Sequence, residues 1–190
     1  MHRRWVPLLL AVTTTGCGYN TIQTYDERAA AAKQNVEVQL QRRADLIPNL
    51  VETVKGYAAQ ETQIFTAVAE ARSRLLNATR GGASPAELDA ANGQLTGALG
   101  RLLAISEAYP QLKSDQNFIR LQDELAGTEN RIATSRNDYN ESVREYNTYI
   151  RRFPTALTAK ATGAKEREYF EATAESQTPP RVDFSRPAGR

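Results

Sequence analysis

The stretch "FIRLQDELAGTENRIATSRNDYNESVREYNTYIRRF", Phe118 to Phe153, has the most regular apolar pattern in the chain. Its apolar and small residues recur at spacings of three and four, which is the period of a helix with one buried face. That face consists of Phe118, Leu121, Leu125, Thr128, Ile132, Ser135, Tyr139, Val143, Tyr146, Ile150 and Phe153. Ser114 or Asp115 can cap its start and Pro154 stops it, so the pattern predicts one helix about 60 Å long at about 1.5 Å per residue. Such a seam is typical of a bundle or coiled coil.

A helical hairpin is predicted before this long helix. The stretch "NATRGGASP", Asn77 to Pro85, is the clearest loop, because paired glycines end one helix and Ser84 with Pro85 starts the next. The third helix is predicted from Pro85 to Tyr109, and Pro110 stops it. Its inward residues are Leu88, Ala91, Leu95, Leu99, Leu102 and Ile105.

The first two helical segments meet at a junction that the sequence leaves open. The first segment begins near Tyr19 and the second reaches Leu76. Their seams consist of Ile22, Tyr25, Ala29, Ala32, Val36 and Leu40, and of Ile64, Phe65, Val68, Ala71, Leu75 and Leu76. Arg43 continues the first seam, and Asp45 and Pro48 then carry a helix-start signal. The junction is therefore either a kink in one long helix or a break between two helices.

The C-terminal part of the chain is less regular. A shorter fifth helix is predicted from Ala156 to Glu175, and residues 177–190, which contain several prolines and few apolar residues, are predicted to be disordered. No alternating run of useful length predicts a strand beyond Cys17. The sequence thus predicts an all-α fold over residues 17–176, an antiparallel bundle of four to five long helices with coiled-coil-like packing.

The N-terminal residues "MHRRWVPLLLAVTTTGC" have the layout of a secretory signal, with Arg3 and Arg4 before an apolar run from Trp5 to Val12. Gly16 directly before Cys17 resembles the lipobox of bacterial lipoproteins, which implies a signal peptide of residues 1–16, cleavage before Cys17 and acylation of its thiol. The alternatives are an uncleaved membrane anchor and a free thiol at Cys17. A membrane-spanning helix needs about 20 apolar residues, and the run from Trp5 to Val12 is far shorter, so the uncleaved anchor is disfavoured. We expect a lipid-anchored protein at the cell membrane with its bulk outside the cytoplasm, and at the outer membrane if the source has two.

The composition argues against several classes of function. The chain has 24 Lys and Arg against 22 Asp and Glu, and loss of Arg3 and Arg4 with the signal leaves 22 of each. A neutral chain disfavours a nucleic-acid partner, because phosphate binding needs a positive excess. The one histidine, His2, lies in the predicted signal and the one cysteine, Cys17, is the predicted acylation site, so histidine and thiolate ligands and a histidine base are missing. A purely carboxylate metal site stays open, but the inward positions contain few acids. We expect no catalytic residue, metal or cofactor, and therefore no enzyme.

Several motifs together resemble the LemA family. They are "GYN" at residues 18–20, "VQLQRRADLIPNLVETVKGYAAQE" from Val38, "YPQLKSDQNFIRLQDEL" from Tyr109, "TENRIATSRNDYNESVREYNTYIRRFP" from Thr128, and "YF" at residues 169–170. Their order and spacing cover nearly all of the chain after Cys17. The resemblance implies a membrane-attached antiparallel bundle of long helices, mostly outside the cytoplasm, with no established catalytic activity.

The polar residues that match the family's motifs are Arg43, Asp45, Glu61, Glu129, Asn130, Arg136, Asn140 and Asn147. They either pair inside the bundle and fix the register of its helices, or they line a groove for a ligand or a protein partner. We favour internal pairing, and expect Arg43 and Glu61 to be held by the long helix, with Glu129 and Arg136 as the acid and the base. We also expect Asn140 and Asn147, each next to a tyrosine in the seam, to bridge helices.

The function predicted from these observations is that of a non-catalytic scaffold or interaction module, with an unidentified protein partner near the membrane. The alternative is a membrane-organising protein whose bundle contacts lipid directly. The neutral charge and the lack of a broad basic amphipathic face disfavour binding to anionic lipid along the bundle. An uncharacterised enzyme is the least favoured reading.

Overall fold

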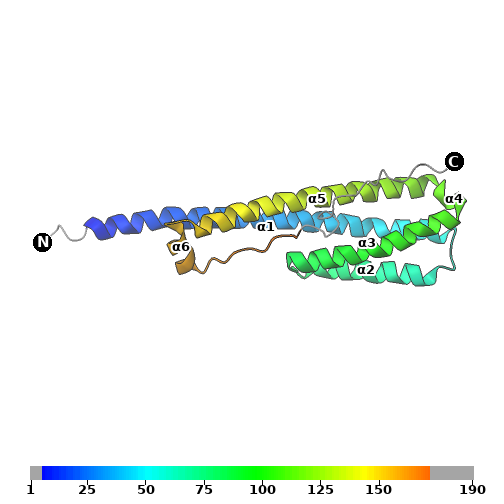
Figure 1. Ribbon diagram of the computed structural model, residues 1–190, viewed down its shortest axis with the longest axis horizontal. Coiled ribbons are helices and arrows are strands. Elements are labelled where there is room, and N and C mark those ends of the chain that lie inside the picture. The colour runs from blue at the N-terminus through cyan, green and yellow to red at the C-terminus, as the bar shows by residue number, and fades with distance from the viewer. Residues whose placement is uncertain (1–5, 172–190) are drawn as a thin grey trace, which may run out of the picture.

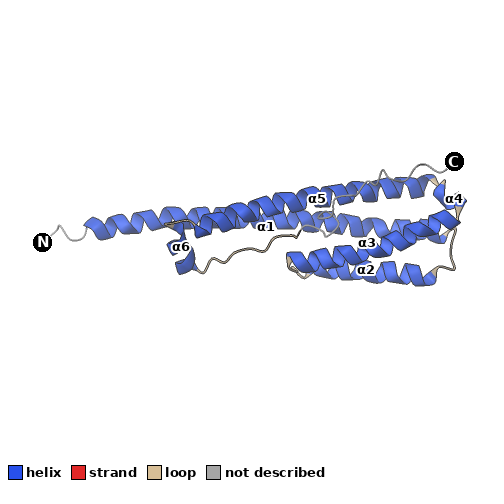
Figure 2. Cartoon of the chain, in the orientation of Figure 1, coloured by secondary structure: helices blue, strands red, loops and turns tan. Residues whose placement is uncertain are grey.

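The computed structural model describes residues 6–171 of the chain, with side chains described from residue 18 onward. Within these residues every regular element is a helix, so the predicted all-α fold is confirmed (Figure 2). The helices are α1 (Val6–Lys55), α2 (Thr62–Arg80), α3 (Pro85–Ala108), α4 (Pro110–Lys113), α5 (Gln116–Arg151) and α6 (Thr155–Thr162). Four of them are long, and α4 and α6 are short.

The two longest helices, α1 and α5, lie side by side in opposite directions (Figure 1). The Tyr25 ring of α1 lies 5.1 Å from the Tyr149 ring near the end of α5, whereas the Tyr57 hydroxyl, just after α1, donates to Asp115 (2.9 Å), just before α5. The hairpin of α2 and α3 covers only the half of this pair nearest α4. Its connecting loop is fixed to α1 where Lys33 Nζ donates to the carbonyl of Ala83 (2.6 Å).

The core follows the predicted seams closely. The buried apolar residues of α1 recur at three, four and seven positions, as in a coiled coil: Ile22, Ala29, Val36, Leu40, Ala44, Ile47, Leu50 and Val54. On α5 the buried seam contains Phe118, Leu125, Thr128, Ile132, Tyr139, Val143, Tyr146 and Ile150. Phe153, predicted to end that seam, is instead 83% exposed, because α5 ends at Arg151 and the chain turns away before Pro154.

Helix α1 continues through Pro48 without a break. Proline has no N–H for the carbonyl four residues earlier, which here belongs to Ala44. That carbonyl accepts a hydrogen bond from Arg72 Nε of α2 instead (2.8 Å). The substitute donor satisfies the freed acceptor, so of the two alternatives a break at Pro48 is wrong. The helix ends at Lys55, and the turn between α1 and α2 lies after it.

The starts of α3 and α5 agree with their predicted capping signals. Ser84 accepts a hydrogen bond from the backbone N–H of Glu87, and the Glu87 carboxylate accepts one from the N–H of Ser84, forming a capping box. Asp115 accepts the N–H groups of Asn117 and Phe118 (both 2.9 Å) and caps α5. These bonds satisfy donors that a helix start otherwise leaves unpaired.

The predicted fifth helix from Ala156 to Glu175 is wrong in its length. Helix α6 ends at Thr162, and Gly163 takes the left-handed conformation (φ 74°) that commonly terminates helices. Residues 163–171, which we call the C-terminal segment, are not helical and run back beside the α1–α5 pair toward α3 (Figure 1). The predicted disordered tail, residues 177–190, lies outside the described residues.

Candidate functional site

Arg43 is the centre of a buried polar contact among three helices. Its side chain extends from α1 and the residue is 6% exposed. Nη1 lies 2.6 Å from Glu129 Oε2 of α5 and donates to Asn92 Oδ1 of α3 (2.6 Å), and Nη2 donates to Thr96 Oγ1 (3.1 Å). One guanidinium group therefore links α1, α3 and α5 at a fixed register.

The electrostatics of this contact favour a structural role for Arg43. Burial lowers the pKa of its guanidinium, Glu129 raises it, and the nearby charge of Arg136 lowers it again. A guanidinium stays charged in a protein, so this charge requires a counter-ion and hydrogen-bond acceptors. Glu129 supplies the charge, and Asn92 and Thr96 supply the neutral acceptors.

Arg136 forms a second junction, where α5, α3 and the C-terminal segment meet. Its Nη2 lies 2.5 Å from Asp89 Oδ1 of α3, and its guanidinium lies 5.4 Å from the centre of the Phe170 ring. Burial raises the pKa of Asp89, whereas the charge of Arg136 opposes that rise. The arginine thus contacts an acid on one side and an aromatic face on the other.

Asn140 and Asn147 bind the backbone of the C-terminal segment. Asn140 Nδ2 donates to the carbonyl of Phe170 and its Oδ1 accepts the N–H of Phe170, both at 2.9 Å. Asn147 makes the same pair of bonds, also at 2.9 Å, with the carbonyl and N–H of Arg167. Each amide therefore pairs with one residue as a neighbouring strand would.

The spacing of the two asparagines matches the spacing of their backbone partners. Seven residues of helix, from Asn140 to Asn147, rise about 10.5 Å. Three residues of extended chain, from Arg167 to Phe170, span about 10 Å. The seven-residue repeat of "YN" on α5 therefore places the two asparagines at the right distance to bind two residues of an extended chain.

Further side-chain contacts hold the second half of the same segment. The Tyr139 hydroxyl donates to the carbonyl of Glu168 (2.8 Å), and its ring meets the Phe170 ring edge-on with centres 5.2 Å apart. Arg167 Nε donates to Asp26 of α1 (2.7 Å), and this hydrogen bond is the main cause that raises the pKa of Arg167. The segment thus takes the place beside α1 and α5 that the hairpin does not reach.

Five of the eight polar residues from the sequence analysis make contacts inside the molecule, at separate places along α5: Arg43, Glu129, Arg136, Asn140 and Asn147. The expected contact of Arg43 with Glu129 is present. The expected contact of Glu61 with Arg136 is wrong. Helix α1 continues past Pro48 to Lys55, so Glu61 lies in the turn after it, next to the start of α5, whereas Arg136 lies in the middle of α5. Glu61 precedes α2, and in the described part of the chain its side chain caps nothing.

The remaining polar predictions also need correction. Asn140 and Asn147 do not bridge helices, because their amide groups bind the C-terminal segment. Asp45 lies on the surface of α1, where it accepts a hydrogen bond from Gln41 (2.9 Å), and Asn130 is exposed on α5. Neither of these two takes part in the buried contacts.

Three contact residues on α3 were missing from the sequence analysis: Asp89, Asn92 and Thr96. Asn92 carried a readable signal, since it lies four residues after Leu88 and three before Leu95, within the apolar seam. A polar residue at such a position needs a buried partner. Asp89 and Thr96 lie outside that seam and gave no comparable signal.

The predicted lipidation site lies within α1, directly before the residues whose side chains are described. Gly16 and Cys17 fall within the backbone of α1, and their side chains are outside the described set, so acylation at Cys17 stays a prediction. No helix among the described residues has a long enough apolar run to cross a bilayer. Nor do those residues gather three His, Cys, Asp or Glu side chains in a metal-binding arrangement.

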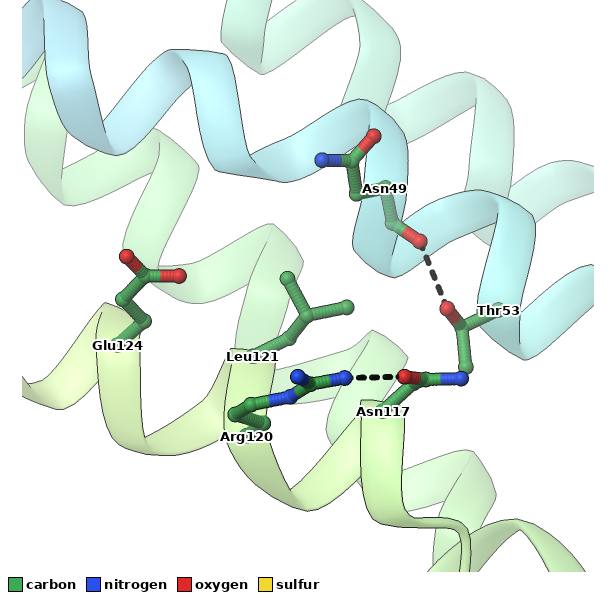
Figure 3. Close-up of a pocket in the computed structure, with 6 residues that line it drawn as sticks. All are labelled: Asn49, Thr53, Asn117, Arg120, Leu121 and Glu124. Carbon is green, nitrogen blue, oxygen red and sulfur yellow. Dashed lines mark hydrogen bonds between the residues drawn. The ribbon is translucent and has the colours of Figure 1, made fainter.

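A shallow groove of about 350 Å³ lies between the last turns of α1 and the first turns of α5 (Figure 3). It is lined by Asn49, Thr53, Asn117, Arg120, Leu121 and Glu124. Arg120 donates to Asn117, and the Thr53 hydroxyl donates to the carbonyl of Asn49 (2.9 Å), so much of its hydrogen-bonding capacity is used locally. This groove provides no nucleophile with an adjacent base.

Comparison with known proteins gives matches over most of the chain. The family model described as LemA family matches residues 32–184. Magnetosome proteins MamQ 1 and MamQ 2 of Paramagnetospirillum magneticum are each 33% identical over 183 residues, which cover 85% of this chain and 67% of theirs. Magnetosome protein MamQ of Magnetospirillum gryphiswaldense is 32% identical over 194 residues, covering 90% of this chain and 71% of that protein.

Proposed function

The chain belongs to the LemA family, and from this premise we propose that it is a non-catalytic scaffold, held at a membrane by a lipid on Cys17, whose bundle binds a protein partner outside the cytoplasm. Family membership and the helical fold are consistent with a non-catalytic role. The lipid, the location and the partner are parts of the proposal.

The observation that carries the proposal is the use of five of the family's eight polar residues within the protein itself. Arg43 and Glu129 join three helices, Arg136 joins two helices to the C-terminal segment, and Asn140 and Asn147 hold that segment's backbone. Groups engaged in this way are not free to bind or transform a substrate. They stabilise the long α1–α5 pair, and a stable elongated surface suits a scaffold.

We expect photo-crosslinking in native membranes to join this surface to protein. A photoreactive amino acid would replace, one at a time, Val38 of α1, Glu70 of α2 and Ile119 of α5, all exposed. These positions sample different parts of the bundle without disturbing its core. The scaffold proposal expects a discrete protein adduct from at least one of them, identified by mass spectrometry.

The matched control is the same variant carrying Cys17→Ala, which should lose the adduct if membrane attachment brings the partner close. Adducts with lipid from all three positions would favour the alternative, in which the bundle itself lies on the membrane. If no position gives a protein adduct, the scaffold proposal is wrong.

The lipid anchor is tested separately by metabolic labelling with a fatty-acid analogue. We expect the wild-type chain to incorporate the label and Cys17→Ala to incorporate none, because the thiol is the predicted acceptor. Mass spectrometry of the purified protein should place the N-terminus at Cys17. Equal labelling of both chains, or a purified protein that still begins at Met1, would rule out the lipoprotein reading.

A further inference from the structure

Three of the seven large apolar residues that are exposed in the described chain belong to the end of the bundle where α6 packs on the start of α1 and the end of α5. Phe153 is 83% exposed and Leu157 is 65% exposed, although both are large and apolar. Tyr19, at the start of the described side chains, is 43% exposed. We call these three residues the end patch. Single exposed apolar residues are ordinary, but Phe153 and Leu157 are the two most exposed of the seven, and they lie only four residues apart.

The packing of α6 places the end patch next to Cys17. A methyl group at Gly18 would lie 3.7 Å from the Thr158 hydroxyl and 3.9 Å from the Thr155 methyl, so α6 packs directly on α1 one residue after Cys17. A small core of its own, which contains Ile22, Tyr146, Ile150 and Ala159, holds this arrangement together. Figure 1 shows α6 where α1 leaves the bundle toward the N-terminus.

The exposed face of α6 points away from that packing. Thr155, Thr158 and Ala159 lie on the side that meets α1 and α5. At 100° per residue, Leu157 and Lys160 lie on the opposite side of the helix, and both are exposed. The outer face of α6 is therefore apolar at Leu157 and cationic one turn further on.

Exposed cationic side chains lie around the end patch, together with one acid, Glu166. Arg152 and Lys160 are exposed, and Arg151 lies 3.7 Å from Glu166 on the C-terminal segment. Long cationic side chains can bury their methylene groups against apolar surface while the charged ends contact phosphate. Aromatic residues such as Phe and Tyr also lie readily at the boundary between lipid and water.

We propose that the end patch inserts into the bilayer interface beside the Cys17 lipid, and so holds the bundle by its end, with the long α1–α5 pair directed away from the membrane. The inference rests on the proposed lipid anchor, because an acylated Cys17 brings this end, and not the α4 end, to the bilayer. The occupant of the patch is thus phospholipid rather than a protein partner.

The inference also explains why Phe153 departs from the predicted seam. Because the chain leaves α5 after Arg151, the phenyl ring points into solvent instead of the core. In contact with a bilayer the same ring would lie about 5–10 Å within the boundary of headgroups and acyl chains. A large apolar side chain that is unfavourably hydrated in the free protein then has an apolar surrounding.

Fluorescence quenching by brominated phospholipid tests this contact. In a Trp5→Phe background, which removes the chain's one native tryptophan, the variants are Phe153→Trp, Leu157→Trp and, at the opposite end of α5, Ile119→Trp. Ile119 is 38% exposed and is the matched control for an exposed apolar position. Each full-length chain is produced in a bacterial host that processes lipoproteins and reconstituted on vesicles of phosphatidylethanolamine and phosphatidylglycerol.

We expect brominated acyl chains to remove most of the fluorescence of Phe153→Trp and Leu157→Trp and to leave that of Ile119→Trp unchanged. Flotation of the vesicles measures the anchor independently. If the protein floats with the vesicles but none of the three variants is quenched, the anchor stands and the end-patch contact is wrong. Equal quenching of all three would mean that the bundle lies flat on lipid, which also overturns end-on attachment. A protein that does not float contradicts both the anchor and this inference.

Discussion

Replacement of Arg43 with alanine is expected to lower the free energy of unfolding by about 3 kcal/mol, near the lower end of the cost of breaking a buried ion pair. Asn92, which is 4% exposed, would lose the donor to its amide oxygen, and Thr96 would lose its donor as well. Glu129 would lose its counter-ion, but its side chain is 47% exposed and can regain water. That partial exposure is why the upper end of the range is not expected.

Urea unfolding of the purified protein measures this effect. Arg80→Ala is the matched control, because Arg80 is exposed in the last turn of α2, where a surface charge contributes about 0–1 kcal/mol. Glu61→Ala should behave like that control, since the Glu61 side chain does not cap α2 and makes no ion pair within residues 18–171. The free energy of unfolding of Arg43→Lys should be intermediate. The lysine ammonium keeps the charge, but it lacks the planar guanidinium that reaches Glu129, Asn92 and Thr96 at the same time. If Arg43→Ala unfolds like Arg80→Ala, the three-helix contact does not stabilise the fold.

The sequence predicted the long helices well because their signal is local. The three-four spacing on α5 and the capping residues Ser84 and Asp115 lie within the elements that they define. The contact of Arg43 with Glu129 could be predicted as well, because the first helical segment was expected to lie beside the long helix, where a charge on its seam needs a partner of opposite sign.

The path of α1 at Pro48 could not be predicted, because the deciding group is far away in sequence. The carbonyl of Ala44 is satisfied by Arg72, which belongs to a different helix. The residues around Pro48 show that an N–H donor is missing, but they do not show that Arg72 replaces it. Because α1 ends only at Lys55, Glu61 lies past the start of α5 and does not meet Arg136.

The non-helical structure of the C-terminal segment could not be predicted from its own residues either. Its backbone groups at Arg167 and Phe170 pair with side chains of Asn147 and Asn140 on α5, and not with a strand or with their own helix. Periodicity and propensity describe how a segment satisfies its own backbone, so they predicted more helix after Ala156. The seven-residue spacing of the asparagines was visible, but its meaning depends on the extended chain that it holds.

The second large effect is expected from Phe170→Ala, which should detach the C-terminal segment from α5. Phe170 is 3% exposed, meets the Tyr139 ring edge-on and lies under the Arg136 guanidinium. Truncating a buried phenylalanine costs about 3–5 kcal/mol. The other residues near it on the segment, such as Glu168 and Tyr169, are exposed and contribute little burial.

Amide hydrogen exchange distinguishes detachment from general destabilisation. A loss of about 3 kcal/mol corresponds to roughly a hundredfold faster exchange, since each 1.4 kcal/mol is tenfold. We expect that acceleration at the N–H groups of Arg167 and Phe170, which the asparagines protect, and much less at the buried centre of α5 around Ile132. The control Tyr169→Ala, at a side chain 41% exposed, should change neither. Equal acceleration at Phe170 and Ile132 would mean that the C-terminal segment and the bundle unfold as one unit. Asn140 and Asn147 would then be part of the core and would not hold a segment that detaches separately.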